Sequence, residues 1–552
     1  MPNTPEHGGQ QAVNAAVDHG VRAMFTLSGA HVFPLYDAAV GGKESVDAGT
    51  HGPLRLVDVR HEQTAVFAAE AIGKLTRTPG LAVVTAGPGV TNAVSAITGA
   101  WVNGSPLVVI GGRAPDARWG SGALQELDHP PLVAPVTKSA TTVHDPADVF
   151  AAVDSAFTLA GSAHRGPVFL DVPMDVLFTP AEAHEGATPH VTDRTPQAGD
   201  IDAVATALRR AERPVLILGS DVWADGAEVS AREFVERFGL PVIANGMARG
   251  VLPPDHPLLV TRARGRAFAG ADLVIVAGTP LDFRLGYGVF GSPESPTPVV
   301  HLVDSPGQVA GHLDLAASAY GDLTMVFARI ADELGDQPAP TEWAQMLREA
   351  ALGAIAADAP LLASDADPIH PARIYGELIP RLSEDAVVIG DGGDFVSFAG
   401  RFIEPKLPGR WLDPGPYGCL GTGPGYAMAA RIAHPESPVV LLMGDGAAGF
   451  SLMDVDSLVR QNLPVVMIVA NNAGWGLERH PMRFLYGYDV VADLAPTHYD
   501  EVVSTLGGAG ETVADPAGIG PAIDRAMNAG VPYLVNVLTD PEVAYPRSTT
   551  GV

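Results

Sequence analysis

The chain has 552 residues, a length that suits roughly three or four domains. Its 34 basic and 63 acidic residues give a formal net charge of −29, which argues against nonspecific binding to nucleic acid or anionic membranes. The single cysteine, Cys419, excludes an intrachain disulfide and fits a reducing compartment. The N-terminus lacks a signal pattern and no apolar run approaches the ~20 residues of a membrane span, so we expect a cytoplasmic protein.

The first third of the chain alternates short apolar runs with helical patterns. Runs within residues 23–112, such as 81–87 (LAVVTAG) and 106–112 (PLVVIGG), are typical of strands, whereas 60–77 carries apolar residues at helical spacing. Fully apolar strands that alternate with helices indicate a parallel sheet covered on both faces. We place this first domain at residues 1–180.

Two polar zones divide the rest of the chain. Residues 180–200 are rich in Pro, Thr, Ala and charge without a sustained period, which indicates a linker. The alternation resumes in a middle domain at 196–335, and a second polar zone at 335–343 precedes a helix. It then begins a third time, in a domain at 365–552. The prediction is an α/β protein with three doubly wound parallel-sheet domains.

Two strands of the third domain bring polar side chains to one sheet edge. The first ends at Gly444 and is followed by Asp445, and the second ends at Asn471 and is followed by Asn472. Between them, apolar spacing predicts a helix over 449–461. Because the carboxyl ends of parallel strands meet at the same edge, where such sheets bind ligands, we expect Asp445 and Asn472 to lie together.

The groups at this edge suit a metal-bound diphosphate. We expect Gly444 and Gly446 to let the backbone turn tightly and approach a ligand, and the N-terminus of the next helix favours an anion. One carboxylate, one amide oxygen and a nearby backbone carbonyl form an all-oxygen set of the kind that Mg²⁺ prefers. Gly-Asp-Gly alone is more often a simple strand-end turn, but its pairing with Asn-Asn favours a diphosphate clamped by Mg²⁺.

This arrangement resembles the signature of thiamine-diphosphate enzymes. The resemblance covers nearly the whole chain, in the pyrimidine, middle and pyrophosphate domain order of the acetolactate synthase-like superfamily. It implies that the first and third domains bind the pyrimidine and pyrophosphate ends of thiamine diphosphate. It also implies that Asp445, the Asn472 side chain and the Gly474 carbonyl bind Mg²⁺.

The resemblance assigns further residues to the cofactor. Residues 391–395 (DGGDF) are similar to the opposite phosphate loop, and 415–430 are similar to the segment that grips the aminopyrimidine. The implied contacts are Gly444, Gly446 and Ala447 near the diphosphate, Asp394 and Phe395 in the opposite loop, and Gly418 and Leu420 at the ring, with the Leu420 side chain as the wedge beneath it.

The family needs one glutamate near the N-terminus, and Glu62 is the candidate. It opens a helix directly after an apolar strand, a position where a glutamate is otherwise a routine helix-dipole partner. The Gly-Pro-Gly turn at 87–89 follows it as in the family, where this glutamate hydrogen-bonds N1′ of the aminopyrimidine. The family also builds each site between two subunits, which implies a homodimer or homotetramer.

Five residues are candidates for the substrate side. His31 stands where synthases more usually have a small residue, and either acts on substrate hydroxyl protons or is satisfied by a neighbouring loop. Gln125 lies in a segment that resembles a substrate-side segment of the synthases. Trp475, Leu477 and Glu478 follow the predicted metal ligands, and the alternative is a surface loop with one buried tryptophan.

The middle domain carries the resemblance to a particular group. Residues 261–288 look more like the oxalyl-CoA decarboxylase and 2-hydroxyacyl-CoA lyase group, which binds ADP here, than like acetolactate synthases, which bind FAD. The resemblance implies that Arg264 contacts the ADP phosphates and that Asp304 takes a ribose hydroxyl. Gly265 stands where the group has serine, so ADP, the less expected FAD, and no nucleotide all stay open. Arg547 is a further candidate for a CoA phosphate.

Three functions follow from these resemblances. The leading one is a 2-hydroxyacyl-CoA lyase, which reversibly cleaves its acyl-CoA substrate to an aldehyde or ketone plus formyl-CoA; the middle domain and residues 498–513 favour it. The alternative is acetolactate synthase-like condensation of 2-oxo acids such as pyruvate with decarboxylation, which the N-terminal segment at 26–38 and the loop after Asn472 favour. A third is a cofactor-binding assembly or regulatory subunit without activity.

Overall fold

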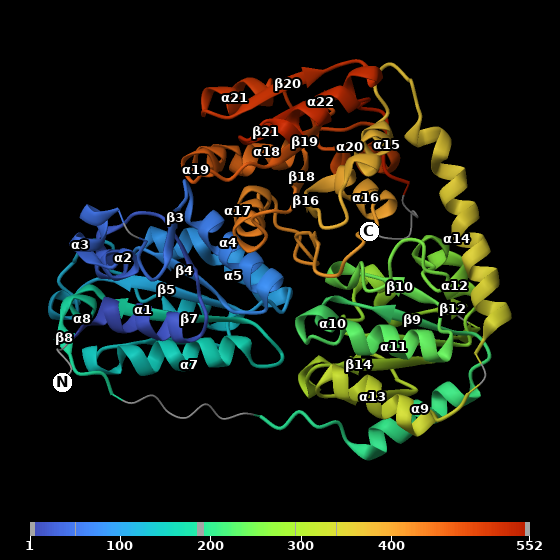
Figure 1. Ribbon diagram of the computed structural model, residues 1–552, viewed down its shortest axis with the longest axis horizontal. Coiled ribbons are helices and arrows are strands. Elements are labelled where there is room, and N and C mark those ends of the chain that lie inside the picture. Colours follow the sequence, from blue (N-terminus) through green and yellow to red (C-terminus); the bar gives the residue numbers. More distant parts are fainter. Residues whose placement is uncertain (1–5, 50, 185–191, 293, 338, 547–552) are drawn as a thin grey trace.

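The chain forms three lobes, each built on its own sheet. The computed structural model describes residues 6–49, 51–184, 192–292, 294–337 and 339–546. Figure 1 shows the first lobe in blue beside the middle lobe in green, with the third lobe in orange and red above both. Within the described ranges, no helix is long and apolar enough to cross a membrane.

The first sheet is parallel throughout, with the strand order β3-β2-β4-β5-β7-β6. Its strands are β2 (Ala23–Thr26), β3 (Arg55–Asp58), β4 (Gly80–Val84), β5 (Leu107–Arg113), β6 (Ser139–Thr142) and β7 (Pro167–Pro173). Its main helices are α1 (Gly8–Asp18), α2 (Phe33–Val40), α4 (Glu62–Thr76), α5 (Pro88–Val102) and α7 (Val149–Gly161). The helices cover both faces, so separate apolar cores form above and below the sheet.

The middle sheet is also parallel, in the order β10-β9-β11-β14-β15. Its strands are β9 (Pro214–Leu218), β10 (Val242–Ala244), β11 (Leu273–Ala277), β14 (Val299–Val303) and β15 (Ala317–Tyr320). Its helices are α9 (Ala198–Arg210), α10 (Ser220–Ala224), α11 (Glu228–Phe238), α12 (Arg264–Gly270) and α13 (Leu323–Leu334). The long helix α14 (Thr341–Leu362) then runs along the outside of the molecule to the third lobe (Figure 1).

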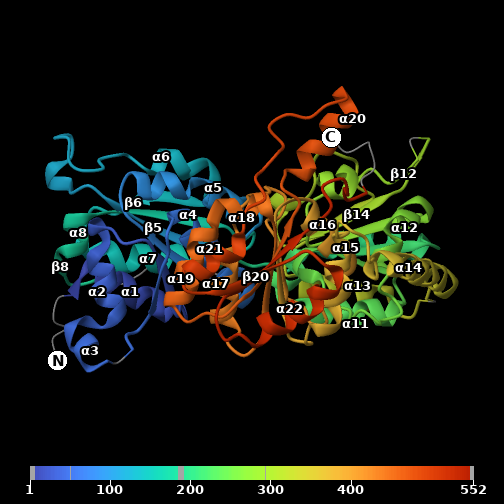
Figure 2. The ribbon, with the colours of Figure 1, turned by 90° about the horizontal axis from the view of Figure 1, so that it is seen from above.

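The third sheet has the parallel order β17-β16-β18-β19-β21-β20. Its strands are β16 (Val387–Asp391), β17 (Trp411–Leu412), β18 (Val439–Gly444), β19 (Val466–Asn471), β20 (Ala509–Val513) and β21 (Tyr533–Leu538). Its helices are α15 (Ala372–Leu378), α16 (Gly393–Phe402), α17 (Gly423–Ala433), α18 (Asp445–Ser451), α19 (Val455–Arg460), α20 (Gly476–Tyr486), α21 (Tyr499–Thr505) and α22 (Pro516–Asn528). Figure 2 shows α20 projecting away from the rest of the lobe.

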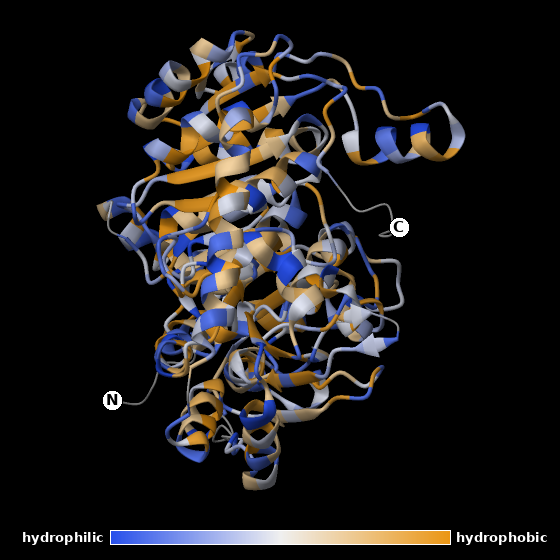
Figure 3. Cartoon of the chain, turned by 90° about the vertical axis from the view of Figure 1, so that its right-hand side faces the viewer, coloured by the Kyte–Doolittle hydropathy of each residue, from blue (hydrophilic) through white to orange (hydrophobic). Residues whose placement is uncertain are grey.

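Burial of the apolar strands explains this architecture. The central strands β4, β9, β11 and β19 are buried along their whole length. Figure 3 shows that hydrophobic strands lie in the interior and that the helices covering them are of mixed polarity. The predicted α/β architecture of three parallel-sheet domains is confirmed. The prediction of a single helix over 449–461 is wrong, because this stretch is divided between α18 and α19, with a 3₁₀ turn between them. The helix breaks at Ser451, which has non-helical backbone angles.

The first and third sheets share one strand order, because β2 to β7 and β16 to β21 are arranged identically. Helices α4 and α17 occupy the same place in the two lobes, and they pack closely along each other. A Cβ on Gly425 would lie 2.9 Å from the Thr64 carbonyl oxygen, so this close approach of the two helices requires glycine. The Tyr426 hydroxyl also donates to Glu70, 2.9 Å away, across the contact.

Candidate active site

One cavity of about 560 Å³ lies between the middle and third lobes, at the carboxyl ends of β16, β18 and β19. This volume is in the range of small-molecule and cofactor sites. The middle lobe contributes Arg249, Phe283 and Arg284 to its wall. The residues predicted from the third domain all line it: Asp394, Phe395, Gly418, Leu420, Gly444, Asp445, Gly446, Ala447, Asn472, Gly474, Trp475, Leu477 and Glu478.

The predicted metal ligands present an unsatisfied oxygen to this cavity. Asp445 follows β18 and Asn472 follows β19, and these two strands pair in parallel. The Asn472 Oδ1 atom is buried and has no hydrogen-bond partner among the described residues. The Asp445 carboxylate accepts the N–H groups of Gly446 and Gly474, each at 3.0 Å, and burial raises the pKa of Asp445 to about 6. An unpartnered amide oxygen and a buried carboxylate fit Mg²⁺ as a ligand pair.

The tight glycine turn of the site lies in the opposite loop. Gly392 and Gly393 have φ values of +83° and +66°, whereas neither Gly444 nor Gly446 has a positive φ. A Cβ on Gly392 would meet the Ala447 Cβ at 2.6 Å, so only glycine lets the two loops approach. The tight turn expected at Gly444 and Gly446 is therefore wrong, because the chain passes there from extended strand directly into α18.

Gly446 has a different role, which is to make room for Trp475. A Cβ on Gly446 would meet the Trp475 ring at 2.4 Å, and this ring also packs edge-on against Phe450 with centroids 6.3 Å apart. The N–H of Gly446, predicted to contact the diphosphate, donates here to the Asp445 side chain. Trp475 thus lines the cavity together with Leu477 and Glu478 and is not merely a loop residue.

Two residues that the sequence did not single out organise the cavity walls. Arg479 is 4% exposed and holds the loop after Asn472 by donating to the Ala473 carbonyl at 3.3 Å and to Asp493 at 2.9 Å. The Tyr499 hydroxyl donates to the Asp445 carbonyl at 3.1 Å. Only the folding of the chain brings these two residues to the site.

Asp391 is a third residue of this kind. It belongs to the predicted phosphate loop, yet it is fully buried and does not line the cavity. Its carboxylate accepts the N–H groups of Gly421 and Gly423 at 3.0 and 2.8 Å. Burial raises the pKa of Asp391 to about 7. Asp391 thus fixes the segment that carries Gly418 and Leu420 against the end of β16.

The N-terminal candidates lie elsewhere. Of the described residues of the first lobe, none lines the cavity. Glu62 is the first residue of α4 and accepts a hydrogen bond from Asn92 on α5 at 3.1 Å. His31 is buried, with its Nδ1 atom 3.1 Å from the Thr85 hydroxyl, and burial lowers the pKa of His31. Both residues therefore sit beside the connection from β4 to α5.

Gln125 reaches the same connection through Gly87. Gln125 has a φ of +59°, and a Cβ on Gly87 would meet the Gln125 Cβ at 2.9 Å. His129, which the sequence did not single out, is fully buried and accepts the Gly87 N–H at its Nε2 atom, 2.9 Å away. Its Nδ1 atom faces Asp171 at 2.8 Å, which fixes the ring orientation. The three N-terminal candidates thus surround one turn, residues 85–92.

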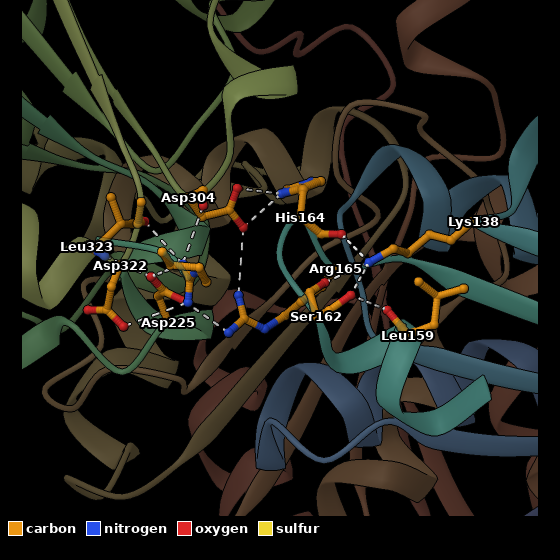
Figure 4. A network of polar contacts seen from close by, with 11 residues as sticks. Lys138, Leu159, Ser162, His164, Arg165, Asp225, Asp304, Asp322 and Leu323 are labelled. Carbon is orange, nitrogen blue, oxygen red and sulfur yellow. Dashed lines mark hydrogen bonds and ion pairs between the residues drawn. The ribbon is translucent and has the colours of Figure 1, made fainter. Parts of the chain in front are cut away.

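The two residues predicted for a nucleotide are not brought together. Arg264 donates to the Arg284 carbonyl. Asp304, at the end of β14, accepts from His164 Nδ1 at 3.0 Å and lies 3.7 Å from Arg165, as Figure 4 shows. Neither Arg264 nor Asp304 lines the large cavity. A ribose hydroxyl at Asp304 would have to compete with two side chains of the first lobe.

Comparisons with known proteins agree with this arrangement. Family models for the N-terminal, central and C-terminal domains of thiamine pyrophosphate enzymes match residues 6–132, 201–330 and 391–537. The acetolactate synthase large subunit IlvG of Mycobacterium tuberculosis is 48% identical over 552 residues, covering 99% of this chain and 98% of that protein. The 2-hydroxyacyl-CoA lyase 2 proteins of Caenorhabditis elegans and Homo sapiens are 35% and 33% identical, covering 92% and 91% of this chain and 84% of each relative. The resemblance inferred from the motifs is confirmed, and the chain belongs to the thiamine pyrophosphate enzyme family.

Proposed function

We propose that this thiamine-pyrophosphate-dependent enzyme condenses 2-oxo acids such as pyruvate with loss of CO₂, as acetolactate synthases do. The observation that carries the proposal is the 48% identity, over 99% of the chain, to a protein named acetolactate synthase. The lyase was the leading expectation from the motifs, and the comparisons support the alternative better, because the lyase relatives are 30 to 35% identical.

The proposal assigns distinct tasks to the chain's own residues. Asp445, the Asn472 amide and the Gly474 carbonyl would hold Mg²⁺ and through it the diphosphate. When bound, thiamine diphosphate supplies a nucleophilic carbon and an electron sink. Glu62 would hold a proton at N1′ of the aminopyrimidine, and Leu420 would support the ring from below.

This proposal needs Glu62 at the cavity, but none of the described residues of the first lobe lines the cavity of the same chain. We therefore propose a homodimer or homotetramer in which a second copy places Glu62, His31 and Gln125 over the cavity. His31, with its lowered pKa, would be neutral near pH 7 and able to take a proton from a substrate hydroxyl. Trp475 and Leu477 would exclude water from the substrate.

The direct experiment offers both substrate classes to the purified protein with thiamine diphosphate and Mg²⁺. One tube receives pyruvate and the other receives short 2-hydroxyacyl-CoA thioesters, and mass spectrometry follows the products. We expect acetolactate and CO₂ from the first tube only. Formyl-CoA, or its products CoA and formate, in the second tube alone would replace this proposal by the lyase.

The lyase is the second candidate, and one observation favours it. Several 2-hydroxyacyl-CoA lyase 2 proteins match more than nine-tenths of this chain. Arg547, the candidate contact for a CoA phosphate, lies outside the described residues. Tight FAD in the purified protein would favour the synthase, and a colourless protein that copurifies with ADP would favour the lyase group.

A further inference from the structure

A second polar cluster lies where the first lobe meets the middle lobe. His164 is in the turn between α7 and β7, Asp221 is in α10 just after β9, and Asp304 follows β14. Each residue offers one ligand atom, and these atoms all lie within 4.8 Å of one another. Two carboxylates from two strand ends therefore converge on one imidazole from another domain.

Asp221 is the member of this cluster that lacks a partner. Its side chain is 8% exposed, and among the described residues no donor forms a hydrogen bond to its carboxylate. Asp225, one helical turn later, instead accepts hydrogen bonds from Arg165 at 3.0 Å, from Arg194 at 2.6 Å and from the Leu323 N–H at 2.9 Å. A buried carboxylate without a donor is costly unless a proton or a cation accompanies it.

Among the described residues, no lysine or arginine forms an ion pair with Asp221, because the nearby cations contact other groups. Figure 4 shows Arg165 reaching from the first lobe to Asp225 and Asp304, while the Lys138 ammonium points to the carbonyls of Ser162 and His164, each 2.7 Å away. Lys138 therefore does not neutralise Asp221 directly. Among the described residues, the charge of Asp221 is therefore balanced only by the His164 imidazole and, at longer range, by Arg165.

The space beside Asp221 suits an ion. A small cavity of about 60 Å³ is bordered by Asp221, His164, Gly278 and Thr279, and this volume holds an ion with one or two waters. The opposite side of the His164 ring packs onto Gly104, where a Cβ would meet the Nε2 atom at 2.4 Å. The ring is thus seated with its Nδ1 edge toward the carboxylates.

We propose that His164, Asp221 and Asp304 bind a divalent transition-metal ion that joins the first lobe to the middle lobe. One imidazole and two carboxylates, with room for water, favour Mn²⁺ or Zn²⁺ over Mg²⁺, which prefers oxygen ligands alone. The ion displaces the hydrogen bond between His164 and Asp304 and neutralises Asp221, while Arg165 stays on Asp225.

The test uses Mn²⁺, because its pulsed EPR spectrum detects nitrogen ligands. The full-length protein carries Asp445→Ala, so that the predicted cofactor metal does not contribute, and it is studied without thiamine diphosphate. We expect one Mn²⁺ per chain with ¹⁴N coupling from one imidazole. His164→Gln should abolish the coupling, and Asp221→Asn should weaken binding at least about tenfold, as loss of a ligand predicts.

Asp322→Asn is the matched control, because Asp322 belongs to the same network but not to the cluster, and asparagine also caps a helix. It should leave Mn²⁺ binding unchanged. The proposal is overturned if Mn²⁺ does not bind, if it binds without nitrogen coupling, or if the coupling survives His164→Gln. The nitrogen coupling of the parent protein decides the matter even if a variant fails to fold. None of these readouts depends on the proposed reaction.

Discussion

Two neighbouring amides show how position alone separates a structural residue from a predicted metal ligand. Asn471 is the last residue of β19, and its side chain donates to the Thr497 carbonyl at 3.0 Å and to Asn536 at 3.1 Å. Asn472, one residue later, leaves its Oδ1 atom without a partner in the described part of the chain. The first amide therefore holds strands together, whereas the second is available to a metal.

The two alanine variants of this pair should have opposite effects. Asn472→Ala should leave the melting temperature of the cofactor-free protein nearly unchanged and raise the Kd for Mg²⁺ and thiamine diphosphate at least about 100-fold. Asn471→Ala should lower the free energy of unfolding by about 1–3 kcal/mol, because it leaves buried groups unpaired. Thermal unfolding and cofactor titration by tryptophan fluorescence measure the two quantities. Equal loss of cofactor affinity in both variants would contradict the assignment of Asn472.

A methyl group on Gly446 should displace Trp475. The Cβ would lie 2.4 Å from the ring, so Gly446→Ala should cost about 1–3 kcal/mol and change the near-ultraviolet circular dichroism of the tryptophan. Gly449→Ala is the matched control, since Gly449 lies in the same helix and a Cβ there meets nothing within 4 Å. An unchanged spectrum in Gly446→Ala would show that the ring is not held there.

The sequence predicts residues that follow directly from strand ends, and it misses those that depend on loop folding. Asp445 and Asn472 were predictable because parallel strands must end at one edge. Asp391, Arg479 and His129 were not, because each binds backbone groups that are distant in sequence or lie in an irregular loop. The glycine turn was likewise placed in the wrong loop, since composition does not reveal φ.

At the scale of elements, one contact joins the two halves of the predicted chemistry. Asp454 lies in the turn between α18 and α19, close in sequence to the predicted metal ligand Asp445. Its carboxylate accepts the Arg60 N–H and the Thr64 hydroxyl, both at 2.7 Å, and so holds the start of α4. The helix that begins with Glu62 is therefore fixed by the cofactor-binding lobe of the same chain.

Asp454→Ala should therefore impair turnover more than cofactor binding. We expect kcat to fall about tenfold or more at saturating thiamine diphosphate, because a displaced Glu62 misplaces a proton, while the cofactor Kd changes little. Asp454→Asn should restore part of the rate, since its amide oxygen still accepts one donor. Asp456→Ala removes only exposed ion pairs to Arg60 and Arg460 and serves as the control. A matching loss of cofactor affinity in Asp454→Ala would refute this positioning role.

Edge strands were the elements least accessible to sequence reasoning. β17 has two residues, and β20 reads Ala-Gly-Glu-Thr-Val, which is neither fully apolar nor alternating. Central strands are recognisable in the sequence as continuous apolar runs, because both of their faces are buried. An edge strand has only one neighbouring strand and leaves no such pattern. The break between α18 and α19 was also not predictable from the sequence, because Asp454, in the turn between them, contacts residues of the first lobe that are distant in sequence.

At the scale of the whole molecule, the cavity and the predicted catalytic residue Glu62 lie in different parts of the described chain. The cavity is lined by the middle and third lobes, and Glu62 lies in the first. The first residues of α20 line this cavity, and exposed apolar side chains lie at the far end of α20 and just beyond it. They are Phe484, Leu485, Tyr486, Tyr488 and Val491, which are 58 to 95% exposed. Such a surface suits contact with a second copy.

Mixing two inactive variants tests whether the site is shared. Glu62→Ala and Asp445→Ala should each be inactive alone. If each site combines the first lobe of one copy with the third lobe of another, co-refolding equal amounts should restore about a quarter of the parent activity, since half of the dimers are mixed and each has one intact site. Activity assays at several mixing ratios measure this. No recovery, with mixed dimers demonstrated by mass, would place both residues in one chain.

The repeated strand order of the first and third lobes separates scaffold from chemistry. The strand that ends before Asp445 corresponds to β4, which ends before Thr85, and the strand that ends before Asn472 corresponds to β5. Equivalent strand ends thus carry Asp445, the acid predicted to bind the metal, in one lobe and a glycine turn in the other, on cores of the same plan. Residues at such positions can differ without disturbing the packing of the core. The same framework, used twice in a single chain, can therefore carry two different tasks, one in each lobe.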